Sequence, residues 1–265
     1  MAAEFKGPAE FKGRAALITG GTGGIGFRVA EQLAGAGAHV FVNGRSGERG
    51  EQAEARLREI SPDARFIAGD CASYQDAAAV VGAARSAAGR LDILVSAGAE
   101  GVAGPMPFAE MTPEQIEGEF RSRLFPRIFP VHAALPALRE NGGSVVLLTT
   151  DAGRFATPGE SVLGAVGAGI IMMTKALAKE FSRYQIRVNS IALALTSGTP
   201  TWDRLFAGES FQRDLFTKVV ERFPFGRAPS ADEAAAVAVF LASDAAAQVT
   251  GQTISVNGGL SFGGW

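Results

Sequence analysis

Cysteine is almost absent from this chain. Cys71 is the only one among 265 residues, so no disulfide can form within the chain. Histidine is equally scarce, and His39 and His132 form no cluster with metal-ligand spacing, so we expect no metal site. A basic excess is missing as well. The formal net charge of −2 argues against a nucleic-acid partner.

Long hydrophobic runs are also missing. The longest uncharged apolar stretch covers residues 161–174, which is shorter than the roughly 20 residues that a membrane-spanning helix needs. The first residues carry a charge at Glu4 and no apolar core, unlike a secretory signal. We therefore expect a cytoplasmic protein with no membrane partner.

Apolar segments of strand length alternate with segments of helical periodicity along the chain. The predicted helices include residues 25–35, 48–60, 75–88 and 232–242, and the predicted strands are residues 15–19, 40–42, 65–68, 93–95, 145–149, 188–192 and 253–256. This alternation implies right-handed βαβ crossovers and a parallel sheet with helices on both faces. No Pro/Ser-rich linker divides the chain. The sequence thus predicts a single doubly wound α/β domain over residues 1–265.

Two further helical segments contain residues that weaken helices. Residues 121–138 include Pro126 and Pro130, and residues 159–180 include Gly164, Gly167 and Gly169. An interior proline costs a helix roughly 3 kcal/mol and a glycine about 1 kcal/mol. We expect both helices to be kinked or packed tightly where only a small residue fits.

A glycine-rich turn follows the first predicted strand directly and opens the first predicted helix. Its sequence is Gly20-Gly21-Thr22-Gly23-Gly24-Ile25-Gly26. Gly20 permits a tight turn, Gly24 allows close approach of a pyrophosphate, and Gly26 lets the helix pack on the strand. The helix N-terminus then offers free N–H groups to phosphates. The turn predicts a Rossmann-type dinucleotide site, with a merely flexible glycine loop as the alternative.

The end of the second strand indicates which dinucleotide is bound. NAD sites place an acidic residue there for the ribose 2′-hydroxyl, whereas this chain has Asn43-Gly44-Arg45-Ser46. A guanidinium can hold a 2′-phosphate through two hydrogen bonds. Arg45 therefore favours NADP(H) as the cofactor, unless it is an ordinary surface arginine.

Over roughly residues 11–259 the chain resembles the short-chain dehydrogenase/reductase family. Residues 19–26 look like the family's T-G-x-x-x-G-x-G motif, and residues 174–192 and 249–259 are similar to its later segments. The resemblance implies a Rossmann-type sheet of about seven strands, a homotetramer and a small-molecule substrate. The cofactor-binding residues predicted from the turn, from Arg45 and from the resemblance are Gly20, Thr22, Gly24, Ile25, Gly26, Arg45, Ser46, Asp70, Cys71, Ala97 and Gly98.

The family's catalytic pair is not matched. In the family a tyrosine exchanges the proton, and a lysine four residues later lowers the pKa of the tyrosine and holds the nicotinamide ribose. The resemblance places these two positions on Leu163 and Gly167. The chain's two tyrosines, Tyr74 and Tyr184, have no lysine four residues later.

Other polar residues are the remaining catalytic candidates. The family's serine falls on Thr150 and its helix asparagine on Arg123. Thr150 could hydrogen-bond a substrate oxygen, and Arg123 could stabilise negative charge if it points inward rather than to the surface. We interpret Asp151 and Glu160 as solvated loop carboxylates, either of which would gain a role if its pKa were raised.

Three functions are compatible with these residues. The first is an atypical NADPH-dependent ketoreductase that takes its proton from water or from a hydroxyl of the substrate. The second is a silent cofactor-binding subunit, and the third is a non-redox dehydratase or isomerase. Residues 196–223, where the family places its substrate lid, are rich in aromatics, which suits a large apolar or polycyclic substrate as well as helix burial: Trp202, Phe206, Phe211, Phe216 and Phe223.

Overall fold

The computed structural model describes residues 10–99, 104–207 and 211–262. The strands are β1 (Ala15–Thr19), β2 (His39–Gly44), β3 (Arg65–Ala68), β4 (Ile93–Ser96), β5 (Gly143–Thr150), β6 (Ile186–Leu193) and β7 (Thr253–Val256). The α-helices are α1 (Gly24–Gly35), α2 (Gly47–Arg58), α3 (Tyr74–Ala88), α4 (Pro113–Arg123), α5 (Phe125–Asn141), α6 (Ser161–Phe181), α7 (Pro200–Phe206), α8 (Phe211–Val220) and α9 (Ala231–Ala242).

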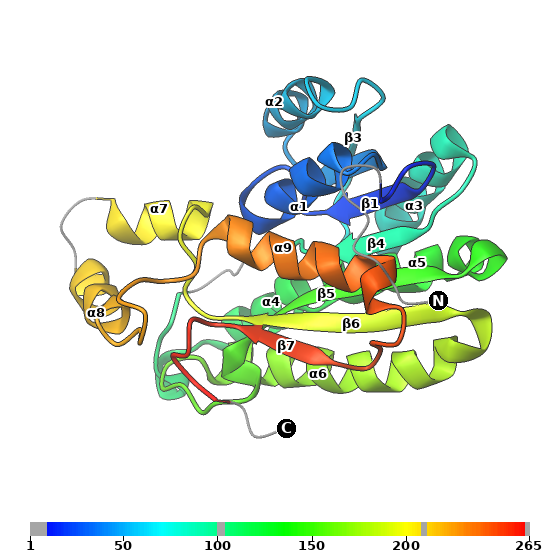
Figure 1. Cartoon of the computed structure of the whole chain (residues 1–265). Coiled ribbons are helices and arrows are strands. Elements are labelled where there is room, and N and C mark those ends of the chain that lie inside the picture. Colours follow the sequence, from blue (N-terminus) through cyan, green and yellow to red (C-terminus); the bar gives the residue numbers. More distant parts are fainter. Residues whose placement is uncertain (1–9, 100–103, 208–210, 263–265) are drawn as a thin grey trace.

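The strands form one parallel sheet in the order β3-β2-β1-β4-β5-β6-β7 (Figure 1). The interior strand β1 pairs with β2 on one side, where Leu17 lies opposite Phe41, and with β4 on the other, where Leu17 lies opposite Leu94. The chain therefore reverses its direction of winding between β1 and β4. This single-domain arrangement confirms the predicted doubly wound α/β fold.

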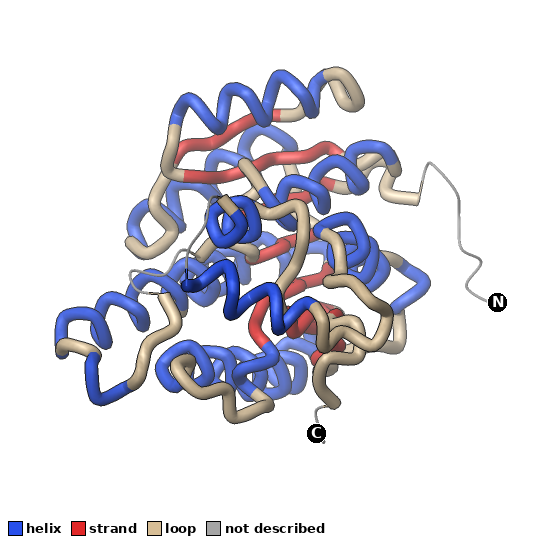
Figure 2. Tube along the Cα trace, turned by 90° about the vertical axis from the view of Figure 1, so that its left-hand side faces the viewer, coloured by secondary structure: helices blue, strands red, loops and turns tan. Residues whose placement is uncertain are grey.

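Helices cover both faces of the sheet: in Figure 2 the blue helices lie on either side of the red strands. The alternation of side chains along β1 explains the two cores. Ala16 and Ile18 point into a core shared with α1, α2 and α9, whereas Ala15 and Leu17 point into a core shared with α3, α5 and α6. Because both faces are buried, the strand is apolar throughout rather than alternating with polar residues.

Residues 121–138 are helical with one interruption, as expected for a kinked segment. Helix α4 ends at Arg123 and α5 begins at Phe125, with Leu124 between them in a helical conformation. Pro126 lies in the first turn of α5, where the missing N–H costs nothing. Pro130 and Pro136 lie inside α5.

Helix α6 (Ser161–Phe181) forms as one helix in spite of its three glycines, and it packs against β5 and β6. Among the described residues, Ser161–Tyr184 is the one helical segment whose length and apolar composition would allow it to cross a membrane. Its side chains Val166 and Ile170 belong to the core under the sheet. Those buried contacts account for much of its apolar character.

Candidate active site

A cavity of about 1660 Å³ opens at the carboxyl ends of the central strands. Residues that follow or end four strands line it: Gly20 after β1, Ala97 after β4, Thr150 in β5 and Leu193 in β6. The cavity includes the point where the strand order reverses, between β1 and β4. Open α/β sheets bind their ligands at this position.

The glycine turn is shaped by two close backbone approaches. Gly20 has a φ of +67°, and a Cβ atom on it would lie 2.5 Å from the Cα of Gly98. A Cβ on Gly26 would lie 2.4 Å from the carbonyl oxygen of Gly20, so the start of α1 sits directly on the turn. Gly23 caps α1 without a side-chain hydrogen bond, which leaves the N–H groups of the first turn available to phosphate. This cradle fits a dinucleotide pyrophosphate.

The turn after β2 holds the residues predicted for the ribose. Arg45 is exposed and lines the cavity. Ser46 does not line it. Its hydroxyl caps α2 by accepting a hydrogen bond from the backbone N–H of Arg49 at 3.4 Å. Ser46 thus has a structural role in addition to any role at the cofactor.

Asn43 is a site residue that the sequence reasoning missed. Its side-chain nitrogen donates to the carbonyls of Ile67 and Gly69 at 3.0 and 3.1 Å, and its oxygen accepts from Cys71 Sγ at 3.2 Å. These bonds fix the loop after β3, which carries Asp70 and Cys71 to the cavity wall. Burial raises the pKa of the Cys71 thiol to about 12, helped by Asp70 and Asp76 nearby, so the thiol stays protonated.

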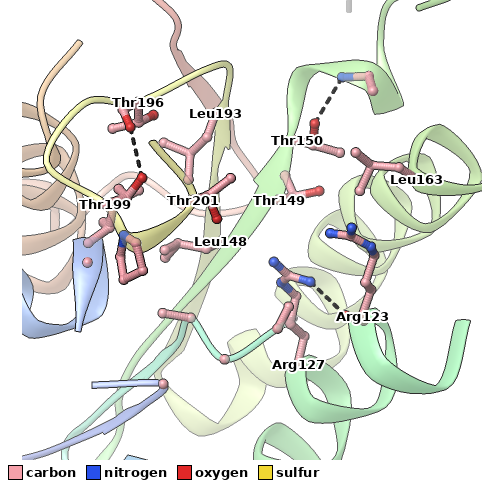
Figure 3. A pocket seen from close by; sticks show the side chains of 18 of the residues that line it. Arg123, Arg127, Leu148, Thr149, Thr150, Leu163, Leu193, Thr196, Thr199 and Thr201 are labelled. Carbon is pink, nitrogen blue, oxygen red and sulfur yellow. Dashed lines mark hydrogen bonds between the residues drawn. The ribbon is translucent and has the colours of Figure 1, made fainter. Parts of the chain in front are cut away.

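Thr150 ends β5 at the opposite end of the cavity. Its hydroxyl oxygen accepts a hydrogen bond from the backbone N–H of Ala152 at 3.2 Å, and its own proton stays available to a ligand. Figure 3 shows Leu163 of α6 beside it, with Thr149 on the same strand. A threonine and a leucine therefore form this wall of the cavity.

Gly167 lies behind Thr150 and has no room for a side chain. A Cβ atom there would lie 2.7 Å from Thr150 Cγ2 and 3.1 Å from the Cα of Gly153. The neighbouring Thr149 hydroxyl donates to the Gly167 carbonyl at 3.2 Å, which holds the helix against the strand. We call this contact of Gly153 with Gly167 the glycine interlock. A lysine at this helix position would collide with it.

The interpretation of Asp151 as a solvated carboxylate is wrong. Asp151 is 7% exposed and accepts hydrogen bonds from Ser255 Oγ at 3.1 Å, from Ser261 Oγ at 2.8 Å and from the side chain of Asn257. Its oxygens therefore fasten β7 and the segment that follows it to the end of β5. The partners lie more than a hundred residues later in the sequence, so no local pattern indicated them.

Glu160 is only partly exposed to solvent. It lies just before α6 and lines both the main cavity and a smaller one of about 40 Å³ that it shares with Glu119, Arg123 and Leu163. Burial raises the pKa of the Glu160 carboxyl, and the positive charge of Arg123 opposes that rise only in part. Glu160 is thus the carboxyl in this wall that burial favours in its protonated form.

Two arginines enter the cavity from the junction of α4 and α5 (Figure 3). Arg123 is paired with the buried carboxylate of Glu119, so it points inward rather than to the surface. Arg127 donates from Nη1 to the Arg123 carbonyl at 2.7 Å, and its buried Nε has no hydrogen-bond partner among the residues that the structure describes. Burial and the charge of Arg123 lower the pKa of Arg127 to about 9, which leaves it a cation at neutral pH. The sequence reasoning missed Arg127, although it lies four residues after Arg123.

The predicted lid folds into α7 and α8, which lie beyond the carboxyl ends of the strands (Figure 1). Its aromatic residues have different surroundings. Phe216 lines the cavity, whereas Phe223 is buried and Trp202 packs on Phe206 with ring centroids 4.3 Å apart. The side chain of Phe211 lies outside the described residues. Of the described aromatic residues of the lid, Phe216 therefore borders the space for a ligand, and the others stabilise the lid.

Every predicted site residue except Ser46 lines this one cavity, and together they define its two halves. The cofactor half contains the glycine turn, Arg45 and the loop after β3. The substrate half contains Thr150, Glu160, Arg123 and Arg127 together with the lid. A doubly wound fold with a dinucleotide cradle opposite polar groups of this kind is typical of the nicotinamide-dependent oxidoreductases.

Comparison with known proteins narrows this class to one family. The family described as enoyl-(acyl carrier protein) reductase matches residues 20–261. An oxidoreductase from Sarocladium schorii is 31% identical over 94% of this chain and 96% of its own length. The 1,6-dihydroxycyclohexa-2,4-diene-1-carboxylate dehydrogenase of Pseudomonas putida is 33% identical over 94% of this chain and 93% of its own.

A solved structure agrees with these relatives. The short-chain type dehydrogenase/reductase from Mycobacterium ulcerans superposes with a TM-score of 0.87 at 26% identity, covering 95% of this chain and 90% of that one. The chain belongs to the short-chain dehydrogenase/reductase family, as its motifs predicted. It is an oxidoreductase of this type, and members of the family use nicotinamide cofactors.

Proposed function

We propose that the protein is an NADP(H)-dependent oxidoreductase that reduces a carbonyl group with a proton donor other than a tyrosine. One observation carries the proposal: a single cavity joins the glycine cradle to Thr150 and to the carboxyl of Glu160, whose pKa burial raises. When bound, the nicotinamide supplies a hydride to the carbonyl carbon. The chain's own residues must then position the substrate oxygen and deliver a proton to it.

Binding of the cofactor is assigned to the cofactor half. The N–H groups at the start of α1 bind the pyrophosphate, and Arg45 pairs with the 2′-phosphate, which distinguishes NADP(H) from NAD(H). No carboxylate ends β2 to oppose that phosphate. Arg45 is therefore expected to decide the cofactor preference.

Proton delivery is assigned to the substrate half. The Thr150 hydroxyl donates a hydrogen bond to the substrate oxygen, but a hydroxyl of this acidity is a poor proton source by itself. Glu160 lines the same wall and burial raises its pKa, so we assign it the role of proton donor, which solvent then reprotonates. A hydroxyl beside the carbonyl of the substrate is a second source, which would act intramolecularly.

The substrate is proposed to be a large apolar or ring-containing compound. Leu148, Leu163, Leu193 and Phe216 line the cavity beside the polar groups. Two relatives from Pseudomonas putida are named for ring-shaped substrates, a dihydrodiol of p-cumate and a cyclohexadiene carboxylate. These names and the apolar walls support a ring that lies flat against the leucines.

Isotope transfer tests the reaction directly. Purified protein is incubated with NADPH deuterated at C4 and with simple ketones alongside hydroxylated polycyclic ones. We expect deuterium to reach the carbinol carbon of at least one ring compound, and Thr150→Val to slow the transfer. The glycine interlock, which excludes a lysine, favours a silent cofactor-binding subunit as the second candidate. That candidate gains if NADPH binds while no label moves across the panel.

Cofactor choice has its own test. Titration calorimetry with NADPH and NADH is expected to show tighter binding of NADPH, and Arg45→Asp is expected to remove that preference. A charge-assisted hydrogen bond is worth about 1.5–3 kcal/mol, so the preference should be at least about tenfold. Equal affinities in the unaltered protein would contradict the assignment of Arg45.

The protein is also proposed to form a homotetramer through α4, α5 and α6. Apolar side chains stay exposed on two of these helices, with Met172 58% and Phe120 36% exposed. Burial of such side chains against a second copy would stabilise the assembly. Sedimentation at micromolar concentration should give a tetramer, and a 27.4 kDa monomer would contradict it.

A further inference from the structure

Arg127 carries a charge that the proposed function does not yet use. Its side chain is half-buried with Nε fully covered, its one hydrogen bond among the described residues goes to the Arg123 carbonyl at 2.7 Å, and no carboxylate of those residues forms an ion pair with it. Buried charges in proteins are normally paired, because taking an ion out of water is costly. An unpaired buried cation that borders a cavity is relieved when an anion enters that cavity.

Other arginines of the substrate half add to the positive charge of Arg127. Three exposed arginines surround its mouth: Arg121, Arg204 and Arg222. Arg123 is neutralised by Glu119, so Arg127 is the inner cation that lacks a counter-charge. A cavity lined in this way attracts negatively charged ligands.

The two carboxylates of this half do not cancel the positive charge. Asp151 accepts hydrogen bonds from Ser255, Asn257 and Ser261 and forms no ion pair with Arg123 or Arg127 among the described residues. Glu160 is favoured in its neutral form by burial. The inner end of the substrate half therefore presents a net positive charge to whatever binds there.

We propose that the substrate half recognises an anionic oxygen on the carbonyl substrate, either a carboxylate or an ionised enol, and that Arg127 is the residue that pairs with it. The planar guanidinium suits both groups, since it can donate two parallel hydrogen bonds to adjacent oxygens. This inference rests on the proposed function for the carbonyl and deepens it by naming the charge of the substrate. A phosphate of the cofactor is the other possible source of an anion, and the test separates the two.

The test measures binding, so it does not depend on turnover. With NADP⁺ present, calorimetry compares benzoylformate with its neutral methyl ester, and 2-hydroxy-1,4-naphthoquinone, an ionised enol, with its methoxy analogue. We expect the unaltered protein to bind at least one anion about tenfold or more tightly than its neutral partner. The variant Arg127→Met should bind both members of that pair alike. Arg139→Gln, at an exposed site on the same helix outside the cavity, serves as the control and should keep the preference.

Stability provides the second measurement. Replacing an uncompensated buried cation by an apolar side chain of similar length should leave Arg127→Met at least as stable to urea as the unaltered protein. A variant that unfolds would show that Arg127 stabilises the fold and would overturn the proposal, as would equal binding of anions and neutral analogues. If Arg127→Met instead weakens NADPH binding tenfold, the anion is the cofactor's phosphate and the substrate assignment fails.

Failure of the proposed function gives a different result. If anions are preferred in an Arg127-dependent way while no deuterium is transferred, the anion site stands and the reductase does not. If label moves to neutral ketones and no anion preference exists, the reductase stands and this inference does not.

Discussion

The two halves of the cavity both depend on glycines that bring backbone against backbone, but to opposite effect. On the cofactor side, the contact of Gly20 with Gly98 leaves a helix N-terminus open to a ligand. On the substrate side, the glycine interlock of Gly153 with Gly167 closes the space that a side chain of α6 would occupy. The first contact prepares binding of a common cofactor, whereas the second removes a position and leaves the chemistry to residues on other elements.

The largest effect is expected from substitution of Glu160, the proposed proton donor. This substitution tests whether the substrate half takes part in the reaction. Loss of a general acid costs about 10²–10⁴-fold in rate. Glu160→Gln should lower the rate of hydride transfer by that factor. In the unaltered protein the rate of reduction should fall as pH rises through the raised pKa of Glu160, because the proton is then lost.

Glu180→Gln is the matched control for that substitution. Glu180 is exposed near the other end of α6, so its variant should transfer hydride at the unaltered rate. If Glu160→Gln also keeps the full rate and the same pH profile, the proton comes from the substrate or from water instead.

The next effect concerns the cofactor half and compares two glycines of α1. Gly26→Ala would place a methyl group 2.4 Å from the Gly20 carbonyl oxygen, so the turn must move. Overpacking of this kind costs about 1–3 kcal/mol, and NADPH affinity should fall by about tenfold or more. Gly35→Ala, which meets nothing within 4 Å, should retain normal affinity. Urea unfolding and fluorescence titration with NADPH would measure both, and equal behaviour of the two variants would disprove the cradle.

The glycine interlock can be tested in the same way on α6. Gly167→Ala should destabilise the protein by about 1–3 kcal/mol, because its methyl group would press on Thr150 and Gly153. Gly169→Ala, two residues later in open space, should stabilise it by up to about 1 kcal/mol. Thermal unfolding of both variants measures these changes in stability. A neutral Gly167→Ala would mean that the space is available to a side chain after all.

The smallest effect is the influence of Glu160 on stability. Its folded pKa is raised above the unfolded value, so the folded state binds more protons between those two pKa values. Stability should therefore fall as pH rises from the unfolded pKa, near 4.3, through the folded one. Glu160→Gln should remove that part of the decline in urea midpoints. If the urea midpoints of Glu160→Gln and of the unaltered protein change with pH in the same way, burial does not raise the pKa of Glu160.

The cofactor half could be predicted from the sequence because its signals are local. The strand, the turn and the helix follow one another within residues 15–35, and each glycine has a role fixed by its immediate neighbours. The seven strands were found for the same reason, since a strand buried on both faces is a continuous apolar run. Only their ends shifted, as where β5 extends from Gly143 to Thr150.

The substrate half could not be predicted in the same way because its contacts join distant elements. Glu160 and Asp151 looked like ordinary loop residues, but burial raises the pKa of Glu160, and Asp151 is buried by residues far along the chain. Arg127 lies one turn after Arg123, near the junction of α4 and α5, where it donates to the Arg123 carbonyl and lines the cavity. The pattern predicted an irregular helix here but not which side chains face the cavity.

The fastening of Asp151 has a consequence for the order in which the protein is made. Its partners Ser255, Asn257 and Ser261 lie 104 to 110 residues further along the chain. During synthesis, β5 leaves the ribosome long before them, at about 5–20 residues per second. For several seconds the carboxylate beside Thr150 thus lacks these three partners. The cavity acquires this part of its wall only after Ser261 and Phe262, which line it, have been made and have docked.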